Sequence, residues 1–265
     1  MEVNTKVNLS GLILDNPVIP ASGTFGFGKE YVDFYDINIL GSISIKGTTV
    51  QRRKGNPQPR IAECYSGLIN SVGLENPGME NVIQKELKDL EMIYRKPVIA
   101  NISGFSVEEY VTLAKEMDKV DNVGIIEVNI SCPNVDHGGL AFGTNADNVR
   151  ELTKKIKEVT TKPIYMKLSP NVTDIKEIAR AAQEGGADGI SLINTLMGMR
   201  IDINRRKPVI ANKKGGFSGP AIFPVALRMV YEVYEATNLP IIGIGGISSA
   251  EDVIEMMMAG ATAVE

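Results

Sequence analysis

The chain has 265 residues, and its 28 Lys and Arg against 32 Asp and Glu give a net charge of −4. This balance does not favour a nucleic-acid or anionic-membrane partner, and no apolar run is long enough to span a bilayer. Two cysteines are too few for a disulfide framework, and the N-terminus lacks the pattern of a signal peptide. We therefore expect a soluble, cytoplasmic protein.

Short segments rich in Val and Ile alternate with helical patterns along the chain. The predicted strands are Pro17–Ser22, Ile39–Lys46, Pro97–Gly104, Gly124–Cys132, Pro163–Ser169, Gly189–Thr195, Pro240–Gly246 and Ala261–Glu265. The predicted helices are Met79–Tyr94, Val107–Val120, Ala146–Thr160, Ile175–Glu184, Phe223–Thr237 and Ala250–Ala259. Three helix starts carry capping signals, which are Ser106 with Glu109, Asp174 with Glu177, and Ser248 with Glu251.

Apolar strands that alternate with helices predict a parallel sheet covered on both faces. Eight such units in this length are typical of a (β/α)₈ TIM barrel, here a single domain over residues 1–265, with a doubly wound open sheet as the alternative. Val3–Leu14 predicts a hairpin at the bottom of the barrel. Long loops after strands 2 and 6, at 47–76 and 196–220, are expected on the functional face.

The sequence stops at Glu265, inside the predicted eighth strand and before any closing helix. We therefore expect the barrel to be incomplete at this end. The segment Ile242–Gly246 is glycine-rich and leads into a helix, which is the pattern of a phosphate site at a helix N-terminus. A second part of that site is expected after strand eight, beyond Glu265, so weak cofactor retention is expected of this chain.

Polar residues end nearly every predicted strand. They are Ser22, Lys46, Asn101, Asn129 with Cys132, Lys167, Asn194 with Thr195, and Gly245 with Gly246. A buried parallel strand has no use for unpaired Lys or Asn, because desolvation of such groups costs several kcal/mol. Since these ends meet at one face, they predict a site for a polar ligand. The amides suit a planar heterocycle, and the lysines suit a carboxylate, a phosphate or an anionic ring.

Two chemistries remain open for these residues. Cys132, in Asn129-Ile-Ser-Cys-Pro-Asn134, places a thiol at a strand end, where catalytic groups of barrels lie. Alternatively, Lys46 or Lys167 forms a Schiff base with a carbonyl substrate, as in an aldolase or lyase barrel. We find no metal-ligand spacing and predict no metal site. His137, the only histidine, is interpreted as an exposed loop residue.

In this order, the motifs resemble the dihydroorotate dehydrogenases of the soluble class 1. The resemblance rests on Ser22, Lys46-Gly47, Asn70-Ser-Val-Gly-Leu74, Asn129–Asn134, Lys167, Asn194-Thr195, Gly219 and Gly245-Gly246. The segments 194–202 and 215–222 look like subclass 1B, whose electrons pass to NAD⁺ through a partner subunit carrying FAD and a [2Fe–2S] cluster. The resemblance thus implies a homodimeric core with an iron–sulfur flavoprotein, in a heterotetramer. Fumarate-linked subclass 1A is the alternative.

The resemblance also implies the reaction and the roles of residues. FMN is the expected cofactor, and the reaction is oxidation of (S)-dihydroorotate to orotate in de novo pyrimidine biosynthesis, with Cys132 as general base and hydride transfer to FMN. The expected FMN contacts are Ser22, Lys46, Gly47, Asn101, Asn129, Lys167, Ile193, Gly219, Gly245 and Gly246. The expected substrate contacts are Lys46, Asn70, Ser71, Val72, Gly73, Leu74, Asn129, Asn194 and Thr195. The segment from Pro133 to Asn145 is expected to be a lid.

Overall fold

The main sheet of the protein has six parallel strands. The computed structural model describes residues 3–131 and 142–265, and the strand order is β14–β13–β8–β7–β6–β5. The strands are β5 (Val98–Ile102), β6 (Val123–Asn129), β7 (Ile164–Lys167), β8 (Gly189–Leu192), β13 (Ile241–Gly243) and β14 (Ala263–Val264). Six of the eight predicted strands are therefore confirmed; each is shorter than predicted, and β6 begins one residue earlier than predicted, at Val123.

The first two predicted strands, Pro17–Ser22 and Ile39–Lys46, do not form ladders. They and the residues next to them contribute isolated parallel bridges, which pair Val18 with Val264, Ser44 with Ile99, and Thr48 with Ile102. Ser22 is not at a strand end, because it begins the short helix α1 (Ser22–Phe25). The bridges continue the sheet at both of its edges, so the fold is α/β with a curled parallel sheet.

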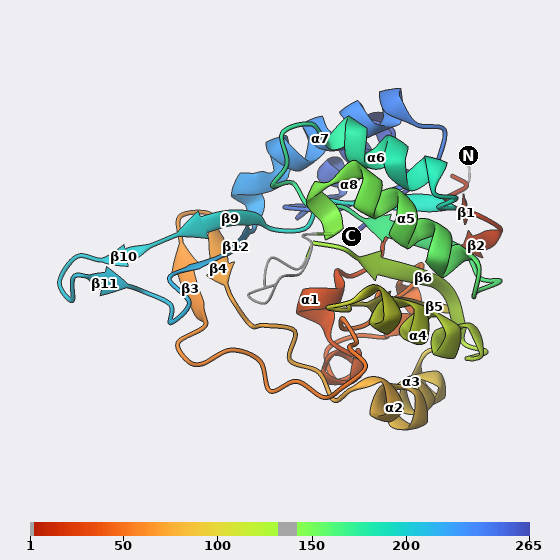
Figure 1. Cartoon of the computed structure of the whole chain (residues 1–265), viewed down its shortest axis with the longest axis horizontal. Coiled ribbons are helices and arrows are strands. Elements are labelled where there is room, and N and C mark those ends of the chain that lie inside the picture. Colours follow the sequence, from red (N-terminus) through yellow and green to blue (C-terminus); the bar gives the residue numbers. More distant parts are fainter. Residues whose placement is uncertain (1–2, 132–141) are drawn as a thin grey trace.

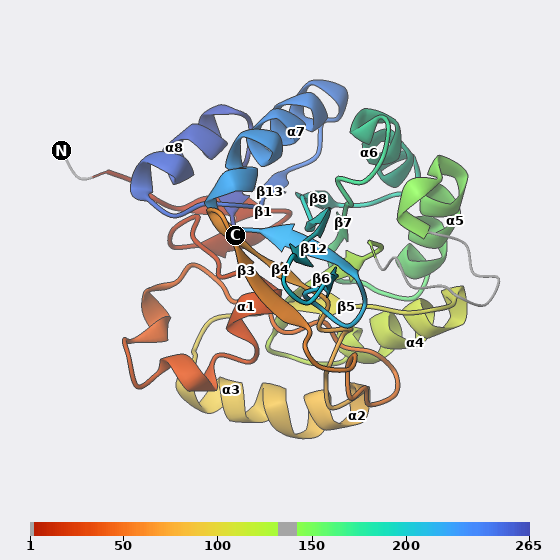
Figure 2. The same cartoon turned by 90° about the vertical axis from the view of Figure 1, so that its left-hand side faces the viewer.

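Helices surround this sheet (Figure 2). They are α2 (Met79–Asn81), α3 (Leu87–Ile93), α4 (Val107–Asp118), α5 (Ala146–Lys157), α6 (Ile175–Glu184), α7 (Phe223–Ala236) and α8 (Ala250–Met258). A π-helical turn, Val82–Glu86, joins α2 to α3, so the helix predicted at Met79–Tyr94 is confirmed as three consecutive pieces. Among the described residues, no helix is long and apolar enough to cross a bilayer.

Side-chain caps fix the starts of several helices. Ser106 Oγ accepts a hydrogen bond from the Glu109 N–H, as predicted, and Asp174 accepts from the Lys176 N–H. The capping box predicted at Ser248 and Glu251 is wrong by one residue. Ser249 and Asp252 form it instead, because Ser249 has the extended backbone of a cap and the Asp252 carboxylate reaches back to its N–H.

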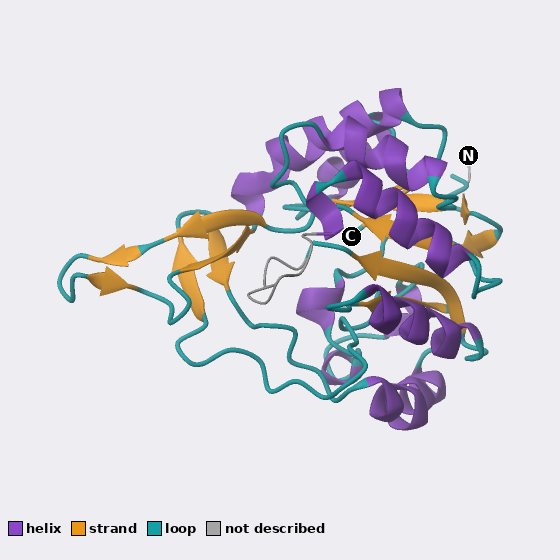
Figure 3. Cartoon of the chain, viewed as in Figure 1, coloured by secondary structure: helices purple, strands orange, loops and turns teal. Residues whose placement is uncertain are grey.

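The two long connections do not remain loops. They fold into a separate antiparallel sheet, which we call the arm and which lies at the left in Figure 1 and among the orange strands of Figure 3. Its order is β3–β4–β12–β9, with β3 (Ile61–Cys64), β4 (Gly67–Asn70), β9 (Leu196–Met199) and β12 (Lys214–Ser218). The small hairpin of β10 (Ile201–Asp202) and β11 (Lys207–Pro208) extends from it.

The core has a separate cluster on the inner face of the curled sheet. It comprises Leu9, Leu14, Ile19, Ile99, Ile125, Tyr165, Ile242, Ile244 and Ala263, while a larger cluster includes residues of both the sheet and the surrounding helices. The predicted hairpin, β1 (Val7–Leu9) with β2 (Leu12–Leu14), contributes Leu9 and Leu14 to the inner cluster. Side chains alternate along a strand, so the residue two positions after each inner apolar residue also faces inward.

Candidate active site

A buried polar layer lies on the inner face of the sheet, one step beyond the apolar cluster. On β5, β6 and β7, and directly after β14, its member stands two positions after an inner apolar residue; these members are Asn101, Glu127, Lys167 and Glu265. Asn101 and Glu127 are fully buried, and the Lys167 side chain is only 7% exposed. The strand-end polarity seen in the sequence therefore belongs to an ordered layer of facing side chains.

Lys167 is held in this layer by two carboxylates. Its Nζ lies 3.2 Å from Glu127 Oε2 and 3.2 Å from Glu265 Oε2. Asn101 Nδ2 also donates to Glu127 Oε2, and Ser44 Oγ does so at 3.4 Å. Burial acts to lower the pKa of Lys167, but the two carboxylates outweigh it and hold that pKa above its usual value. The Lys167 amine is therefore protonated at neutral pH.

An amide network continues from β6 toward the end of β8. Asn129 Oδ1 accepts from Ser131 Oγ at 2.6 Å and from Asn194 Nδ2 at 3.3 Å. Asn194 Nδ2 also donates to Ser131 Oγ, and Asn194 Oδ1 accepts from the Thr195 N–H at 2.7 Å. The structure thus brings Asn129, Asn194 and Thr195 together, as their predicted shared role requires. Ser131 was not predicted to take part.

Lys46 lines a cavity of about 580 Å³. The cavity is bounded by Gly23, Thr24, Phe25, Gly26, Glu30, Tyr31, Phe34, Lys46, Val72 and Glu75. Burial lowers the pKa of Lys46, partly opposed by Glu75. Gly47 is packed directly on the polar layer, since a Cβ there would lie 2.9 Å from Asn101 Oδ1.

Three glycines form a close backbone contact at the ends of the later strands. Gly219, Gly245 and Gly246 all have positive φ, at 113°, 127° and 76°. A Cβ on Gly246 would lie 2.8 Å from the Gly219 carbonyl oxygen, and one on Gly245 would lie 3.5 Å from Ile193 Cγ1. Only glycine fits such a conformation and approach, and backbone N–H groups at glycines of this kind suit a phosphate. These four predicted residues therefore lie side by side.

The predicted substrate segment, Asn70 to Leu74, leaves the arm at the end of β4. Asn70 Nδ2 donates to the Gly216 carbonyl at 3.4 Å, and a Cβ on Gly216 would overlap Thr195 Oγ1. Asn70 and Thr195 therefore flank the same residue of β12. At the other end of the segment, Leu74 lies next to Gly47, the residue after Lys46, since Leu74 Cδ2 would be 3.5 Å from a Cβ on Gly47.

Cys132, the predicted base, lies outside the described residues. So do Asn134, His137 and most of the predicted lid. Ser131, in the amide network, is the residue immediately before Cys132. Cys132 is thus the next residue in the sequence after the described part of the site.

Comparison with known proteins identifies the family. The model of the family described as dihydroorotate dehydrogenase matches residues 4–265. A protein of Bacillus cytotoxicus named dihydroorotate dehydrogenase B (NAD(+)), catalytic subunit, is 58% identical over 259 residues, which cover 98% of this chain and 84% of that protein. Proteins of the same name from Bacillus cereus and Bacillus anthracis match equally. The chain belongs to the dihydroorotate dehydrogenase family.

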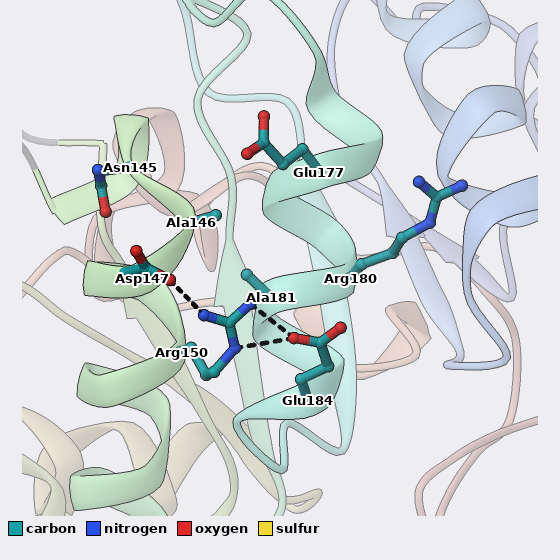
Figure 4. A pocket seen from close by; sticks show the side chains of 8 residues that line it. All are labelled: Asn145, Ala146, Asp147, Arg150, Glu177, Arg180, Ala181 and Glu184. Carbon is teal, nitrogen blue, oxygen red and sulfur yellow. Dashed lines mark hydrogen bonds and ion pairs between the residues drawn. The ribbon is translucent and has the colours of Figure 1, made fainter.

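In this member of the dihydroorotate dehydrogenase family, a second cleft lies away from the strand ends. It measures about 260 Å³ and lies between α5 and α6 (Figure 4). Arg150 there pairs with Asp147 on the same helix and with Glu184 on α6. None of the predicted site residues lines this cleft, and exposed ion pairs of this kind are ordinary helix-surface contacts. Nor do the described residues contain a cluster suited to a metal ion.

Besides Ser131, sequence reasoning missed two residues of the buried polar layer, Glu127 and Glu265. Glu127 stands in the apolar run Gly124–Ile130, two positions before Asn129, and thus faces inward like it. Its alternation with Ile125 and Asn129 along the strand could have revealed it, because a lone carboxylate at a buried, inward-facing position needs a cationic partner. Glu265 likewise stands two positions after Ala263, which lies in the inner apolar cluster, and so faces inward.

Proposed function

We propose that this chain oxidises (S)-dihydroorotate to orotate in de novo pyrimidine biosynthesis. The observation that carries the proposal is that Lys46, Lys167 and the Asn129–Asn194 network lie at the same end of the sheet, in a chain of the dihydroorotate dehydrogenase family. These groups supply two cations and several neutral donors and acceptors. That set matches a ring that carries a carboxylate and alternating C=O and N–H groups.

The residues present fit FMN. Asn101 Oδ1 is buried without a hydrogen-bond partner among the described residues, and the positive-φ backbone at Gly219, Gly245 and Gly246 is suited to a phosphate. The full set proposed to hold FMN is Ser22, Lys46, Gly47, Asn101, Asn129, Lys167, Ile193, Gly219, Gly245 and Gly246. FMN, when bound, supplies the acceptor for the hydride that leaves C6 of the substrate. Lys167 would provide positive charge for the N1/C2=O side of the ring.

The substrate is oriented by the remaining polar groups. Lys46 pairs with its carboxylate, and Asn70, Asn129 and Asn194 read its ring edges. The backbone from Ser71 to Leu74 and the Thr195 side chain complete its surroundings. Cys132 would remove the proton from C5, for which its thiolate is the basic form.

The Schiff-base alternative is less well supported for Lys167. A nucleophilic lysine must be neutral, and the carboxylates of Glu127 and Glu265 favour the ammonium form of Lys167. Lys46 has its pKa lowered by burial, so it is the amine that this alternative needs. Borohydride trapping of Lys46 with a carbonyl substrate would favour a lyase over a dehydrogenase.

We also propose that the sheet closes into an eight-stranded barrel within a single domain. The Gly41 N–H donates to the Val18 carbonyl at 2.9 Å, which links the two segments that flank the six-stranded sheet. Val18 in turn bridges to Val264, and Ser44 bridges to Ile99. Backbone contacts of this kind support closure between the first and second predicted strands.

The electrons are proposed to pass to NAD⁺ through a partner subunit. The relatives from Bacillus are named as catalytic subunits of an NAD⁺-linked enzyme, which supports subclass 1B over the fumarate-linked subclass 1A. By the resemblance, the partner carries FAD and a [2Fe–2S] cluster, and a homodimer of this chain forms the core. Copurification with an iron–sulfur flavoprotein tests this assignment.

The reaction is tested by orotate formation from dihydroorotate with FMN and an artificial electron acceptor. We expect Cys132→Ala to lower kcat by about 10²–10⁴-fold, the contribution of a general base. Cys64→Ala is the matched control, since Cys64 is a half-buried thiol on β3, and we expect it to leave kcat unchanged. Equal activity of Cys132→Ala and the unmodified chain would refute the base assignment.

A further inference from the structure

The buried polar layer contains one more carboxylate than it needs to neutralise its lysine. Glu127 comes from β6, Lys167 from β7, and Glu265 follows β14, and both carboxylate side chains are fully buried. Among the residues that the structure describes, the other polar groups in the layer, from β5, β8 and the segment at 43–48, are neutral; they are Asn101, Ser191 and Ser44. The three charged groups must therefore balance one another without help from solvent.

Two buried carboxylates and one ammonium carry a net negative charge if all are ionised. Such a charge is costly in a low-dielectric interior, so one carboxyl is expected to hold a proton. The structure indicates which one. Glu127 Oε2 accepts a hydrogen bond from Asn101 in addition to those from Lys167 and Ser44, so three donors face this carboxyl. Burial and the neighbouring Glu127 charge raise the pKa of Glu265 to about 8, against the opposing effects of Lys167 and of a hydrogen bond from Ser44.

The same contacts fix the position of Lys167. A lysine side chain has a flexible four-carbon stem, and its ammonium is not oriented by its own geometry. Here Nζ is held at 3.2 Å by carboxylates from two separate strands. Glu127 is itself anchored by two further donors, so it acts as the fixed side of this clamp.

We propose that Glu127 and Glu265 are positioning residues that clamp Lys167, and that Glu265 carries the exchangeable proton that sets the net charge of the flavin site. The role toward the flavin rests on the proposed function. A reduced flavin carries more negative charge than an oxidised one, so a neutral cluster favours reduction more than a negative cluster does. As Glu265 ionises, the midpoint potential of bound FMN should therefore fall further than it does from the pH dependence of flavin reduction alone.

The first test compares the midpoint potential of bound FMN at pH 6.5 and pH 9. Glu265→Gln and Glu127→Gln each leave one lysine with one carboxylate, so both variants should match the unmodified protein at pH 6.5. At pH 9 they should favour reduced over oxidised flavin about tenfold more than the unmodified protein does, which is about 30 mV for a two-electron couple. Asp188→Asn is the matched control, because Asp188 pairs with Lys157 immediately before β8, at the opposite end of the strands.

The second test needs no flavin. The folded-state pKa of Glu265 is raised above its ordinary value of 4.5, so the folded protein binds more protons than the unfolded chain between about pH 4.5 and 8. Glu265 therefore stabilises the fold at low pH, and this contribution is lost as pH rises through about 8. In apo protein, Glu265→Gln should remove this part of the pH dependence of the unfolding free energy, and Asp188→Asn should retain it.

The outcomes of the two tests distinguish the role of Glu265 toward the flavin from the assignment of the proton to Glu265. Parallel pH–potential curves for Glu265→Gln and the unmodified protein would overturn the role toward the flavin while leaving the dehydrogenase function intact. An unchanged pH dependence of apo stability in Glu265→Gln would overturn the assignment of the proton. Failure of every variant and of the unmodified protein to bind FMN would overturn both the proposed function and the role toward the flavin, whatever the apo protein shows.

Discussion

The charged residues of this site are determined by which face of a strand they occupy. Glu127 and Lys167 occupy the same face as the inner apolar residues that precede them, Ile125 and Tyr165. A shift of either by one position would turn the side chain toward the covering helices. In the register of β6 and β7, Lys167 lies opposite Asn129, so its long side chain reaches Glu127 at the preceding inward position, 3.2 Å away.

At Gly47 the space for a side chain is absent. A Cβ there would lie 2.9 Å from Asn101 Oδ1, so Gly47→Ala must displace a buried amide of the polar layer. We expect a loss of about 1–3 kcal/mol in unfolding free energy, the usual cost of overpacking, together with weaker FMN binding. Denaturant unfolding of the apo protein and a flavin titration measure the two effects.

Gly23→Ala is the control for this substitution, since a Cβ on Gly23 would meet nothing within 4 Å. Gly23 lines the same cavity as Lys46. Equal stability of Gly47→Ala and Gly23→Ala would show that the polar layer tolerates displacement, contrary to the close packing described above.

At the scale of elements, the arm was the main feature that sequence patterns did not predict. Its strands are at most five residues long, β12 contains two consecutive glycines, and β4 and β12 pair although they lie about 150 residues apart in sequence. Short strands of this kind leave no clear periodic signal, and their pairing depends on contacts between distant segments. By contrast, each strand between two long helices was located correctly, because a continuous apolar run flanked by helical periodicity is a strong pattern.

The arm is expected to contribute to substrate binding through Gly216. Its backbone lies between Asn70 and Thr195, and a Cβ there would overlap Thr195 Oγ1. Gly216→Ala should therefore raise KM for dihydroorotate roughly tenfold to a hundredfold, the equivalent of overpacking by about 1–3 kcal/mol, with a smaller effect on kcat. Steady-state kinetics measure this split.

Arg205→Ala is the matched control, on the β10–β11 hairpin that extends from the arm. Its side chain is 85% exposed, so we expect KM to stay within twofold of its original value, because exposed substitutions rarely cost more than about 0.5 kcal/mol. If Gly216→Ala also left KM unchanged, the arm would have no part in the substrate site.

At the scale of the whole molecule, much of the fold and part of the site could be predicted from the amino-acid sequence. The alternation of strands and helices predicts a covered parallel sheet, and two of the predicted strand-end residues, Asn101 and Lys167, both contact Glu127. Ser22 departs from the pattern because the chain turns into α1 at that residue. Glu127 and Glu265 were not predicted because a single charge inside an apolar run reveals its role only when its partner on another strand is known.

The central claim is that the converging strand-end residues form a flavin site that oxidises dihydroorotate. The most direct measurement is an anaerobic titration of the FMN-loaded protein with dihydroorotate, followed by the flavin absorbance and by orotate analysis. We predict bleaching of the flavin, with one orotate formed per flavin reduced. A flavin that stays oxidised with excess dihydroorotate, or a protein that binds no FMN, would contradict the account.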